Sequence, residues 1–270
     1  MKILEHIADL RKTVNKIDNL GLVPTMGGLH KGHISLIKES KKKCKKTLVT
    51  IYINPRQFNN IKDFKLYPRR LNKDLILLKN LKVNFLYLPD SKEIYKNKNI
   101  KKIKLNEKEK ILCAKFRNGH FEGVLDIMKR FVSLIKPKYV FMGEKDFQQY
   151  YLVKKYLQNH YSSKIVKCKT IRDKNFVPLS TRNFLLSKKN IQIASKISKK
   201  LKKLKLEITN KEKIKYYLAK IKLNLQNEYK IKIDYLEARC EKDLKTYIIN
   251  KKFKLFIAYH LKKIRLIDNF

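Results

Sequence analysis

Apolar residues along this chain follow two alternating patterns. Short, nearly continuous apolar runs rich in β-branched residues are typical of buried parallel strands. Apolar residues that recur every three or four positions are typical of helices packed on one face. The first pattern predicts strands over residues 21–24, 47–53, 83–88, 139–142 and 164–171. The second predicts helices over residues 1–20, 34–43, 71–81 and 124–135, and a further helix that begins at Phe147.

This alternation of strand and helix predicts an α/β fold with a Rossmann-like parallel sheet and right-handed crossovers. Between two of the elements, residues 91–112 are rich in Lys and Asn, and we expect them to lie at the surface. In a doubly wound sheet, ligands bind at the carboxyl ends of the strands. The loops that follow the predicted strands are therefore the first place to look for chemistry.

The C-terminal part of the chain has a different pattern. Two Lys-rich amphipathic helices, at about 188–204 and 210–226, are followed by short predicted strands around 229–236, 255–259 and 264–267. We therefore predict two domains. Residues 1–174 would form the Rossmann-like domain, and residues 175–270 a smaller α+β lid.

The formal net charge of +43 changes this picture little. The basic residues are mostly Lys scattered along the chain, Trp is absent and Gly is scarce, a composition that AT-biased codons would produce. A nucleic-acid partner would instead favour Arg clustered among aromatic residues. We expect no specific nucleic-acid partner, although an RNA-binding protein that exploits this charge stays open as an alternative. The field would also raise the local concentration of anionic substrates.

Cysteine spacing and hydropathy favour a cytoplasmic protein that does not enter membranes. The four cysteines, at positions 44, 113, 168 and 240, form no close pair that would indicate a zinc site or a disulfide framework. The N-terminal residues do not resemble a signal peptide. No apolar run approaches the roughly 20 residues of a membrane span.

The most informative segment is the turn after the first predicted strand, PTMGGLHKGHISLI (residues 24–37). It places two histidines three residues apart, His30 and His33, among glycines at the start of a helix. Free backbone N–H groups and imidazoles at that point suit a phosphate. A metal would need a third ligand, and no GxxxxGK[ST] motif is present. An HxGH turn instead marks enzymes that attack the α-phosphorus of ATP and expel pyrophosphate.

Three further groups are candidates for the same chemistry. Ser180, Thr181 and Arg182 offer hydroxyls and a guanidinium for the β- and γ-phosphates, although Ser and Thr are also common helix caps. In the loop GEKD (residues 143–146), the lysine follows an apolar strand, and the aspartate is placed to hold Mg²⁺ or a ribose hydroxyl. Glutamines 57 and 149 lie at predicted strand ends, where neutral amides can fix a hydroxy acid.

Seven blocks together resemble the pantothenate synthetase (pantoate–β-alanine ligase) family: PTMGGLHKGHISLI, INPRQFN, YPR, FRNGHFEGV, FMGEKDFQQ, TIRD and LSTRN. They occur in that family's order over most of residues 20–187, and the terminal RLIDN is similar as well. The HxGH turn alone would indicate only the wider nucleotidylyltransferase superfamily. Another member of that superfamily, acting on a phosphorylated acceptor, is therefore the alternative.

The resemblance implies a ligase that uses ATP and Mg²⁺. Pantoate would attack ATP to give pantoyl adenylate and pyrophosphate, and β-alanine would then displace AMP to give pantothenate. The family also implies a homodimer. Carried over by position, the catalytic residues would be His33, His30, Lys145 and Arg182. Gln57 and Gln149 would bind pantoate and β-alanine, and Asp146 would bind the metal. The ATP site would consist of Met26, Gly27, Gly28, Leu29, His30, Lys31, Gly32, His33, Gly143, Glu144, Lys145, Asp146, Ile171, Leu179, Ser180, Thr181 and Arg182.

Four positions depart from the family's usual residues. Lys31 replaces a commonly acidic residue, Asn118 a common Pro, Leu179 a common Met and Thr181 a common Ser. Thr keeps the hydroxyl and Leu keeps the apolar volume, so the resemblance implies tuning of activity and not its loss.

Overall fold

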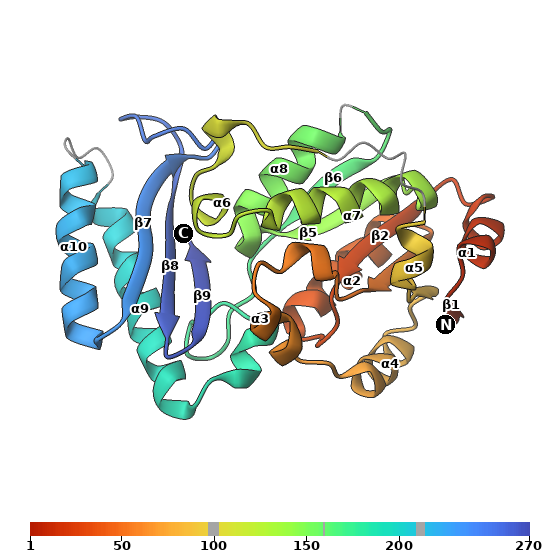
Figure 1. Cartoon of the computed structure of the whole chain (residues 1–270), viewed down its shortest axis with the longest axis horizontal. Coiled ribbons are helices and arrows are strands. Elements are labelled where there is room, and N and C mark those ends of the chain that lie inside the picture. Colours follow the sequence, from red (N-terminus) through yellow and green to blue (C-terminus); the bar gives the residue numbers. More distant parts are fainter. Residues whose placement is uncertain (97–102, 159, 209–213) are drawn as a thin grey trace.

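A six-stranded, fully parallel sheet forms the centre of the N-terminal part of the chain (Figure 1). The computed structural model describes residues 1–96, 103–158, 160–208 and 214–270. The strand order is β1-β4-β3-β2-β5-β6. Their bounds are β1 Lys2–Leu4, β2 Leu20–Thr25, β3 Lys46–Ile51, β4 Phe85–Tyr87, β5 Tyr139–Gly143 and β6 Lys164–Cys168. This parallel sheet and the small second sheet described below confirm the predicted α/β class.

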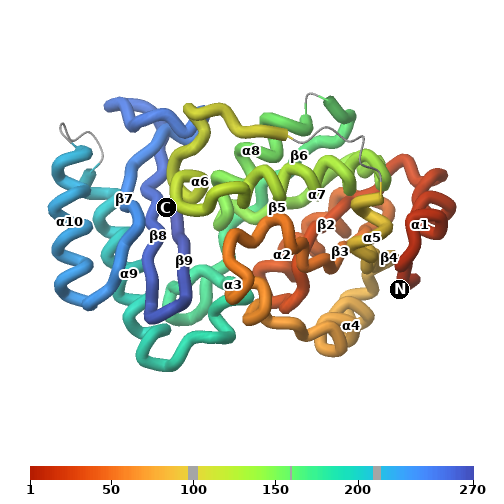
Figure 2. Tube along the Cα trace, viewed as in Figure 1, coloured from red at the N-terminus to blue at the C-terminus, as the bar shows by residue number. Residues whose placement is uncertain are grey.

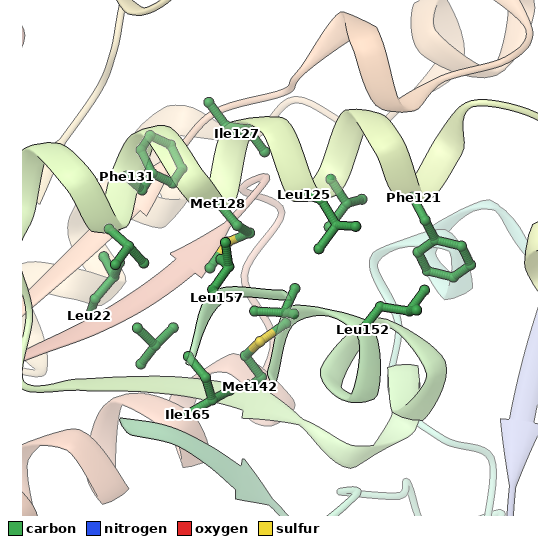
Figure 3. Close-up of a cluster of buried hydrophobic side chains, with 14 of the residues drawn as sticks. Leu22, Phe121, Leu125, Ile127, Met128, Phe131, Met142, Leu152, Leu157 and Ile165 are labelled. Carbon is green, nitrogen blue, oxygen red and sulfur yellow. The ribbon is translucent and has the colours of Figure 1, made fainter. Parts of the chain in front are cut away.

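Both faces of the sheet are buried, because its strands are apolar on both sides. Along β2 and β3, Leu22 and Leu48 belong to the core on one face, whereas Val23 and Val49 belong to the core on the other. The first face packs against α1 (Ile7–Val14), α7 (His120–Ile135) and α8 (Phe147–Leu157); the second packs against α2 (Lys31–Lys43) and α4 (Leu71–Asn80). Figure 3 shows the apolar face of α7 above Met142 of β5 and Ile165 of β6.

Short helices fill the connections between these elements. They are η1 Pro55–Gln57, α3 Ile61–Leu66, α5 Ser91–Ile94, η2 Glu107–Glu109, α6 Cys113–Phe116, η3 Glu144–Asp146 and η4 Thr181–Leu185. Three of them, η1, η3 and η4, contribute with the histidine turn to the site described below.

The C-terminal unit is a three-stranded antiparallel sheet covered by two helices. Its strands are β7 Lys232–Cys240, β8 Phe253–Leu261 and β9 Ile264–Asn269, and its helices are α9 Lys188–Glu207 and α10 Ile214–Tyr229. One face of the sheet forms a core with these helices. From the other, Tyr235, Phe256 and Ala258 join the core of the N-terminal unit.

The two units lie side by side, and the C-terminus is close to their junction (Figures 1 and 2). The expected boundary at residue 174 falls in the connection between β6 and α9. The division into domains 1–174 and 175–270 stays a prediction.

Several local predictions were wrong. Residues 1–20 are not one helix: Lys2–Leu4 pair in parallel with β4 at the sheet edge, and the helix begins only at Ile7. The pairing supplies backbone hydrogen bonds that a short apolar triplet does not announce. Residues 91–112 are not all surface, because Ile94, Leu105 and Leu112 are buried; positions 97–102 of this segment lie outside the described residues.

The predicted bounds of three further elements also moved. The strand predicted over 164–171 ends at Cys168, and that predicted over 229–236 runs from Lys232 to Cys240. The helix expected at about 210–226 extends to Tyr229, and its expected positions 210–213 lie outside the described residues. Within the described ranges, no helix has both the length and the apolar character needed to cross a bilayer.

Candidate active site

A cavity of about 230 Å³ opens where β2 and β5 end. These neighbouring strands are the point at which the chain order reverses: β3 and β4 extend the sheet from β2 to one side, and β6 extends it from β5 to the other. Such a switch point leaves a crevice at the carboxyl ends of the strands. The cavity is lined there by the histidine turn, η1, the start of α7, the GEKD loop, residues 169–171 and residues 179–182.

The histidine turn caps α2 with its own side chains. His30 Nδ1 accepts from the Gly32 amide at 3.1 Å, and His33 Nδ1 accepts from the His30 amide at 3.3 Å. The two rings lie 4.1 Å apart, centroid to centroid. Because each Nδ1 is an acceptor, each neutral ring carries its proton on Nε2. Both rings line the cavity with that N–H left to donate.

Both imidazoles are neutral at physiological pH. Burial lowers the pKa of His30 to about 4, with a further contribution from the positive charge of Lys145. Burial also lowers the pKa of His33 to about 3, and the neighbouring His30 adds to the effect. The two histidines therefore present hydrogen-bond donors to the cavity and no full positive charge.

The expectation that the backbone amides of this turn are free was wrong. Asp74 of α4, a buried carboxylate, accepts from the Gly28 and Leu29 amides at 2.8 Å each. The Gly27 amide donates to Thr25 Oγ1 at 3.2 Å. Gly27 and Gly28 adopt positive φ values of 76° and 61°, which glycine reaches without strain. The glycines thus shape the turn around Asp74, and the imidazoles remain as the donors toward the cavity.

The loop that carries Gln57 is held by close packing against α7. A Cβ on Gly123 would lie only 2.1 Å from the carbonyl oxygen of Arg56, so glycine is required by this approach. The buried Asn54 donates to the Gly123 carbonyl at 3.0 Å and accepts from Tyr95 Oη at 2.8 Å. Gln57 is consequently fixed at the cavity wall, with its amide nitrogen against Met26 Sδ.

Arg117 and His120 form a second polar group on the same wall. His120 Nδ1 lies 2.7 Å from the Gln57 carbonyl and must donate to it, so its Nε2 accepts from Arg117 Nη1 at 2.8 Å. Burial lowers the pKa of His120 well below its usual value, with the positive charge of Arg117 as the next cause. Burial and Arg182 lower the pKa of Arg117 to about 10, so its guanidinium stays charged.

Residues 179–182 cross from the C-terminal side to the histidine turn. Thr181 is buried, and its hydroxyl donates to the Gly28 carbonyl at 3.2 Å. Its methyl group occupies the space beside Gly28, where a Cβ on the glycine would be 2.3 Å away. Thr in place of Ser therefore adds a packing contact to this crossing. Arg182 pairs with Asp63 of α3 at 2.8 Å.

The GEKD loop presents two of its charged side chains to the cavity and one away from it. Lys145 and Asp146 line the cavity, with Lys145 Nζ 3.6 Å from Asp146 Oδ1. Glu144 instead pairs with Lys167 at 3.1 Å and with Lys254 of β8 at 3.0 Å. These ion pairs hold the pKa of Glu144 below its usual value despite its partial burial.

The structure therefore brings most of the predicted site residues together. Those that line the cavity are Met26, His30, Gly32, His33, Gln57, Gly143, Lys145, Asp146, Gln149, Ile171, Leu179, Ser180, Thr181 and Arg182. Gly27, Gly28, Leu29, Lys31 and Glu144 are outside this lining. Gly28 acts through its contacts with Asp74 and Thr181, and Lys31 is exposed.

Sequence reasoning missed four residues of this site: Asn54, Asp74, Arg117 and His120. Asn54, Arg117 and His120 stood inside the blocks INPRQFN and FRNGHFEGV, and their polar character beside predicted strand and helix ends was the available signal. Asp74 gave none, since it occupies an ordinary polar position of an amphipathic helix.

Comparisons with known proteins agree over the whole chain. The sequence model of the family described as pantoate-beta-alanine ligase matches residues 2–270. A pantothenate synthetase of Francisella tularensis subsp. novicida is 35% identical over 269 residues, 99% of this chain and 95% of that protein. One from Francisella philomiragia is 36% identical over 275 residues, 100% of this chain and 95% of that protein.

Solved structures give the same result for the fold. The crystal structure of pantoate-beta-alanine ligase from Francisella tularensis, complexed with beta-gamma ATP and beta-alanine, is similar with a TM-score of 0.84 at 34% identity. The match covers 100% of this chain and 97% of that one. A pantothenate synthetase from Thermus thermophilus is similar with a TM-score of 0.85 at 25% identity, over 100% of this chain and 99% of that one.

Proposed function

Because this chain belongs to the pantoate-beta-alanine ligase family and is an ATP-dependent ligase of pantothenate synthesis, we propose that it works through a pantoyl adenylate formed in the cavity between β2 and β5. The match over both parts of the chain, and not the histidine turn alone, favours the ligase over another nucleotidylyltransferase. The single observation that carries the assignment of the site is the convergence of His30, His33, Lys145 and Gln57 on one cavity.

In the first step, a carboxylate oxygen of pantoate attacks the α-phosphorus of ATP, and the bond from that phosphorus to the leaving pyrophosphate breaks. Negative charge on the phosphate oxygens is then met by the Nε2–H groups of His30 and His33 and by the ammonium of Lys145. Such preorganised donors are the largest contributors to catalysis of this type. Neutral imidazoles suit the role, because they donate without competing as permanent cations for the carboxylate nucleophile.

The segment 179–182 provides the second set of phosphate ligands. Ser180 and Arg182 line the cavity beside the histidine turn, and Thr181 fixes the segment to that turn through the Gly28 carbonyl. We assign the guanidinium of Arg182 to the β- and γ-phosphates, since its planar fork suits phosphate oxygens. Its pair with Asp63 is solvent-accessible, and a triphosphate can compete with it.

Further residues of the cavity lining suit a small branched hydroxy acid and an amino acid. Gln57 and Gln149 offer neutral amides for hydroxyl and carboxylate groups, and Arg117 offers a charge for a carboxylate. Apolar groups from Val124, Met128 and Phe131 line the same cavity and suit the methyl groups of pantoate.

In the second step, the neutral amine of β-alanine attacks the acyl carbon of the adenylate. The bond from that carbon to the AMP oxygen breaks, the nitrogen loses a proton, and pantothenate and AMP leave. The main contribution of the protein to this step is to hold the amine and the acyl carbon in one cavity.

Magnesium enters this scheme with ATP. Among the described residues, no group of three or more His, Cys, Asp or Glu side chains forms a metal cage. A magnesium ion carried by phosphates needs only one or two protein carboxylates. Asp146, partly exposed in the cavity beside Lys145, fits that requirement and would be the ligand. The ion would neutralise charge on the phosphate oxygens.

The experiment that tests the site separates the two steps. With ATP and pantoate alone, the enzyme should release one pyrophosphate per active site, and AMP should turn over only after β-alanine is added. His33→Ala should slow pyrophosphate release by roughly 10²–10³-fold, as for loss of an oxyanion donor. His160→Ala, at an exposed position, is the matched control. Wild-type release by the His33 variant would remove its assigned role, and release without pantoate would reject the adenylate.

The acid-binding end has its own test. Gln57→Leu and Gln149→Leu should raise the KM for pantoate while ATP binding, measured by calorimetry, is kept. Unchanged KM values in both variants would instead fit an enzyme whose acceptor is a phosphoester.

We also propose a homodimer and a cytoplasmic location, both on the family resemblance. The cytoplasmic assignment is supported by four free, buried cysteines. Light scattering after gel filtration should give a mass twice that of the single chain, and the mass of a monomer would refute the dimer.

A further inference from the structure

The last strand of the chain contacts a turn of the N-terminal unit that lines the cavity. Asn269, at the end of β9, is buried, and its side-chain Nδ2 donates to the carbonyl oxygens of Glu144 at 3.0 Å and Lys145 at 2.8 Å. These two carbonyls belong to η3, the three-residue turn that carries Lys145 and Asp146 into the cavity. One side-chain amide of the C-terminal unit therefore fixes the backbone of the turn through two hydrogen bonds.

The orientation of this amide has only one satisfactory solution. Both neighbours of Nδ2 are carbonyl acceptors, so the opposite orientation would place three oxygens against one another. The side-chain oxygen, Oδ1, is buried without a hydrogen-bond partner among the described residues. Burying an acceptor without a partner is unfavourable. The hydrogen bonds from Nδ2 to the two carbonyls therefore determine where this side chain lies.

The neighbouring residue ties down the other wall of the nucleotide site. The buried Asp268 forms a two-pronged pair with Arg172, with both N–O distances at 2.8 Å, and also accepts from Ser198 at 3.0 Å. Arg172 directly follows Ile171, which lines the cavity. The Ile171 carbonyl in turn accepts from the Leu179 amide, at the start of the segment that leads to Arg182.

We propose that Asn269 is a positioning residue for the adenylation step, acting through the η3 turn on Lys145 and Asp146. This inference rests on the proposed role of those two residues toward ATP. A turn of three residues has little hydrogen bonding of its own, and a long lysine side chain amplifies any movement of its backbone. Asn269 supplies the missing constraint, and its effect belongs to the step in which the phosphates react.

The test uses the whole enzyme and measures the two steps separately. Asn269→Leu keeps the number of heavy atoms and the branching of the side chain and removes both donors. Pyrophosphate release from ATP and pantoate should fall by roughly 10–100-fold, since misplacement of a reacting group by about 1 Å costs that much. Formation of pantothenate from supplied pantoyl adenylate and β-alanine should change less than about threefold. Equal losses in both steps, or no loss in either, would overturn the proposal.

A matched control and a second variant keep the test sharp. Ile264→Ala removes packing at the opposite end of the same strand, where the side chain packs against the core of the C-terminal unit, and both steps should stay near the wild-type rates. Asn269→Asp places a carboxylate against the two carbonyls. Adenylation by this variant should be slow at pH 7.5 and should recover, relative to wild type, toward pH 5.5, because a protonated carboxyl again donates one hydrogen bond. A constant ratio to wild type across that range would count against the proposal.

Lys145→Ala separates failure of this inference from failure of the proposed function. If Lys145→Ala slows pyrophosphate release and Asn269→Leu does not, only the inference fails. If Lys145→Ala has no effect, the assigned site itself is wrong. In the double variant, Asn269→Leu should cost less than it does alone, because part of its effect passes through Lys145; full multiplication of the two losses would show that Asn269 does not act through Lys145 and would overturn the proposal.

Discussion

Gly123→Ala tests whether the fit between α7 and η1 positions the proposed acid-binding wall, formed by Gln57, Arg117 and His120. The added Cβ would lie 2.1 Å from the Arg56 carbonyl oxygen, 2.5 Å from the Arg56 carbonyl carbon and 2.8 Å from the Gln57 nitrogen. All three are backbone atoms, so no flexible side chain can yield. Contacts of real Cβ atoms stay above 3.0 Å, so the distance of 2.1 Å from the added Cβ to the Arg56 carbonyl oxygen must grow by about 0.9 Å. To allow this, α7 and η1 must move apart by about that amount.

Stability is the weaker readout of this change. Overpacking of this kind costs about 1–3 kcal/mol, whereas replacing Gly by Ala inside a helix stabilises it by about 1 kcal/mol. The two effects leave a net loss of roughly 0–2 kcal/mol in the free energy of unfolding. Activity is the stronger readout, because Gln57 holds His120 through its carbonyl and His120 holds Arg117.

We therefore expect kcat/KM for pantoate and β-alanine to fall by about 10²-fold, the usual result of a misplacement of about 1 Å. ATP binding, measured by calorimetry, should be nearly unchanged, since His30, His33 and Lys145 are not displaced. Ser133→Ala, at an exposed position of the same helix, controls for helix propensity. A Gly123→Ala enzyme within about twofold of wild type for all three substrates would refute the reasoning.

The contacts of the site lead to three more predictions. Asp74→Ala leaves two buried amides without an acceptor and should lower the free energy of unfolding by about 2–6 kcal/mol, measured by denaturant titration, with a smaller loss for Asp74→Asn. The pKa of His33 is about 3 in the folded protein and about 6.5 in the unfolded chain, so the stability that its neutral ring contributes above pH 6.5 is lost as the pH falls toward 3. Between pH 6 and 4, the free energy of unfolding of the His33→Gln variant should therefore fall by about 1.4 kcal/mol less per pH unit than that of wild type, measured by denaturant titration. Asp63→Ala releases Arg182 and should lower the KM for ATP by up to about fivefold, whereas a rise in that KM would show that Asp63 orients the guanidinium productively.

The sequence predicted which side chains gather at the cavity better than it predicted the contacts that hold them there. The histidine turn, the GEKD loop and the segment Ser180–Arg182 could each be recognised from a short stretch of sequence. Each is a short run of polar or charged side chains beside the end of a strand or helix. The two histidines even cap the helix among themselves, within three residues. The parallel sheet, with ligands expected at the carboxyl ends of its strands, was predicted as well, since an alternating pattern of strands and helices leaves few topologies open.

The anchoring contacts could not be predicted in this way. Asp74 lies 46 positions beyond Gly28, and Asn269 lies 125 positions beyond Glu144. A buried polar partner so distant in sequence has no pattern of its own; only the fold shows which amide or carbonyl it faces. The short first strand was missed for the same reason, because its pairing partner, β4, is more than eighty residues away.

The difference between surface charges and buried anchoring contacts also explains how a chain with a net charge of +43 keeps a defined site. Its lysines lie mostly at exposed positions, where single charges have little effect on stability. The contacts that fix the site are instead buried and neutral or internally paired: Asp74 on two amides, Thr181 on Gly28, Asn269 on two carbonyls, and Asp268 on Arg172. Surface composition can therefore drift without moving the imidazoles or the lysine, whereas a change at one of these four contacts acts directly on a segment that lines the cavity or adjoins its lining.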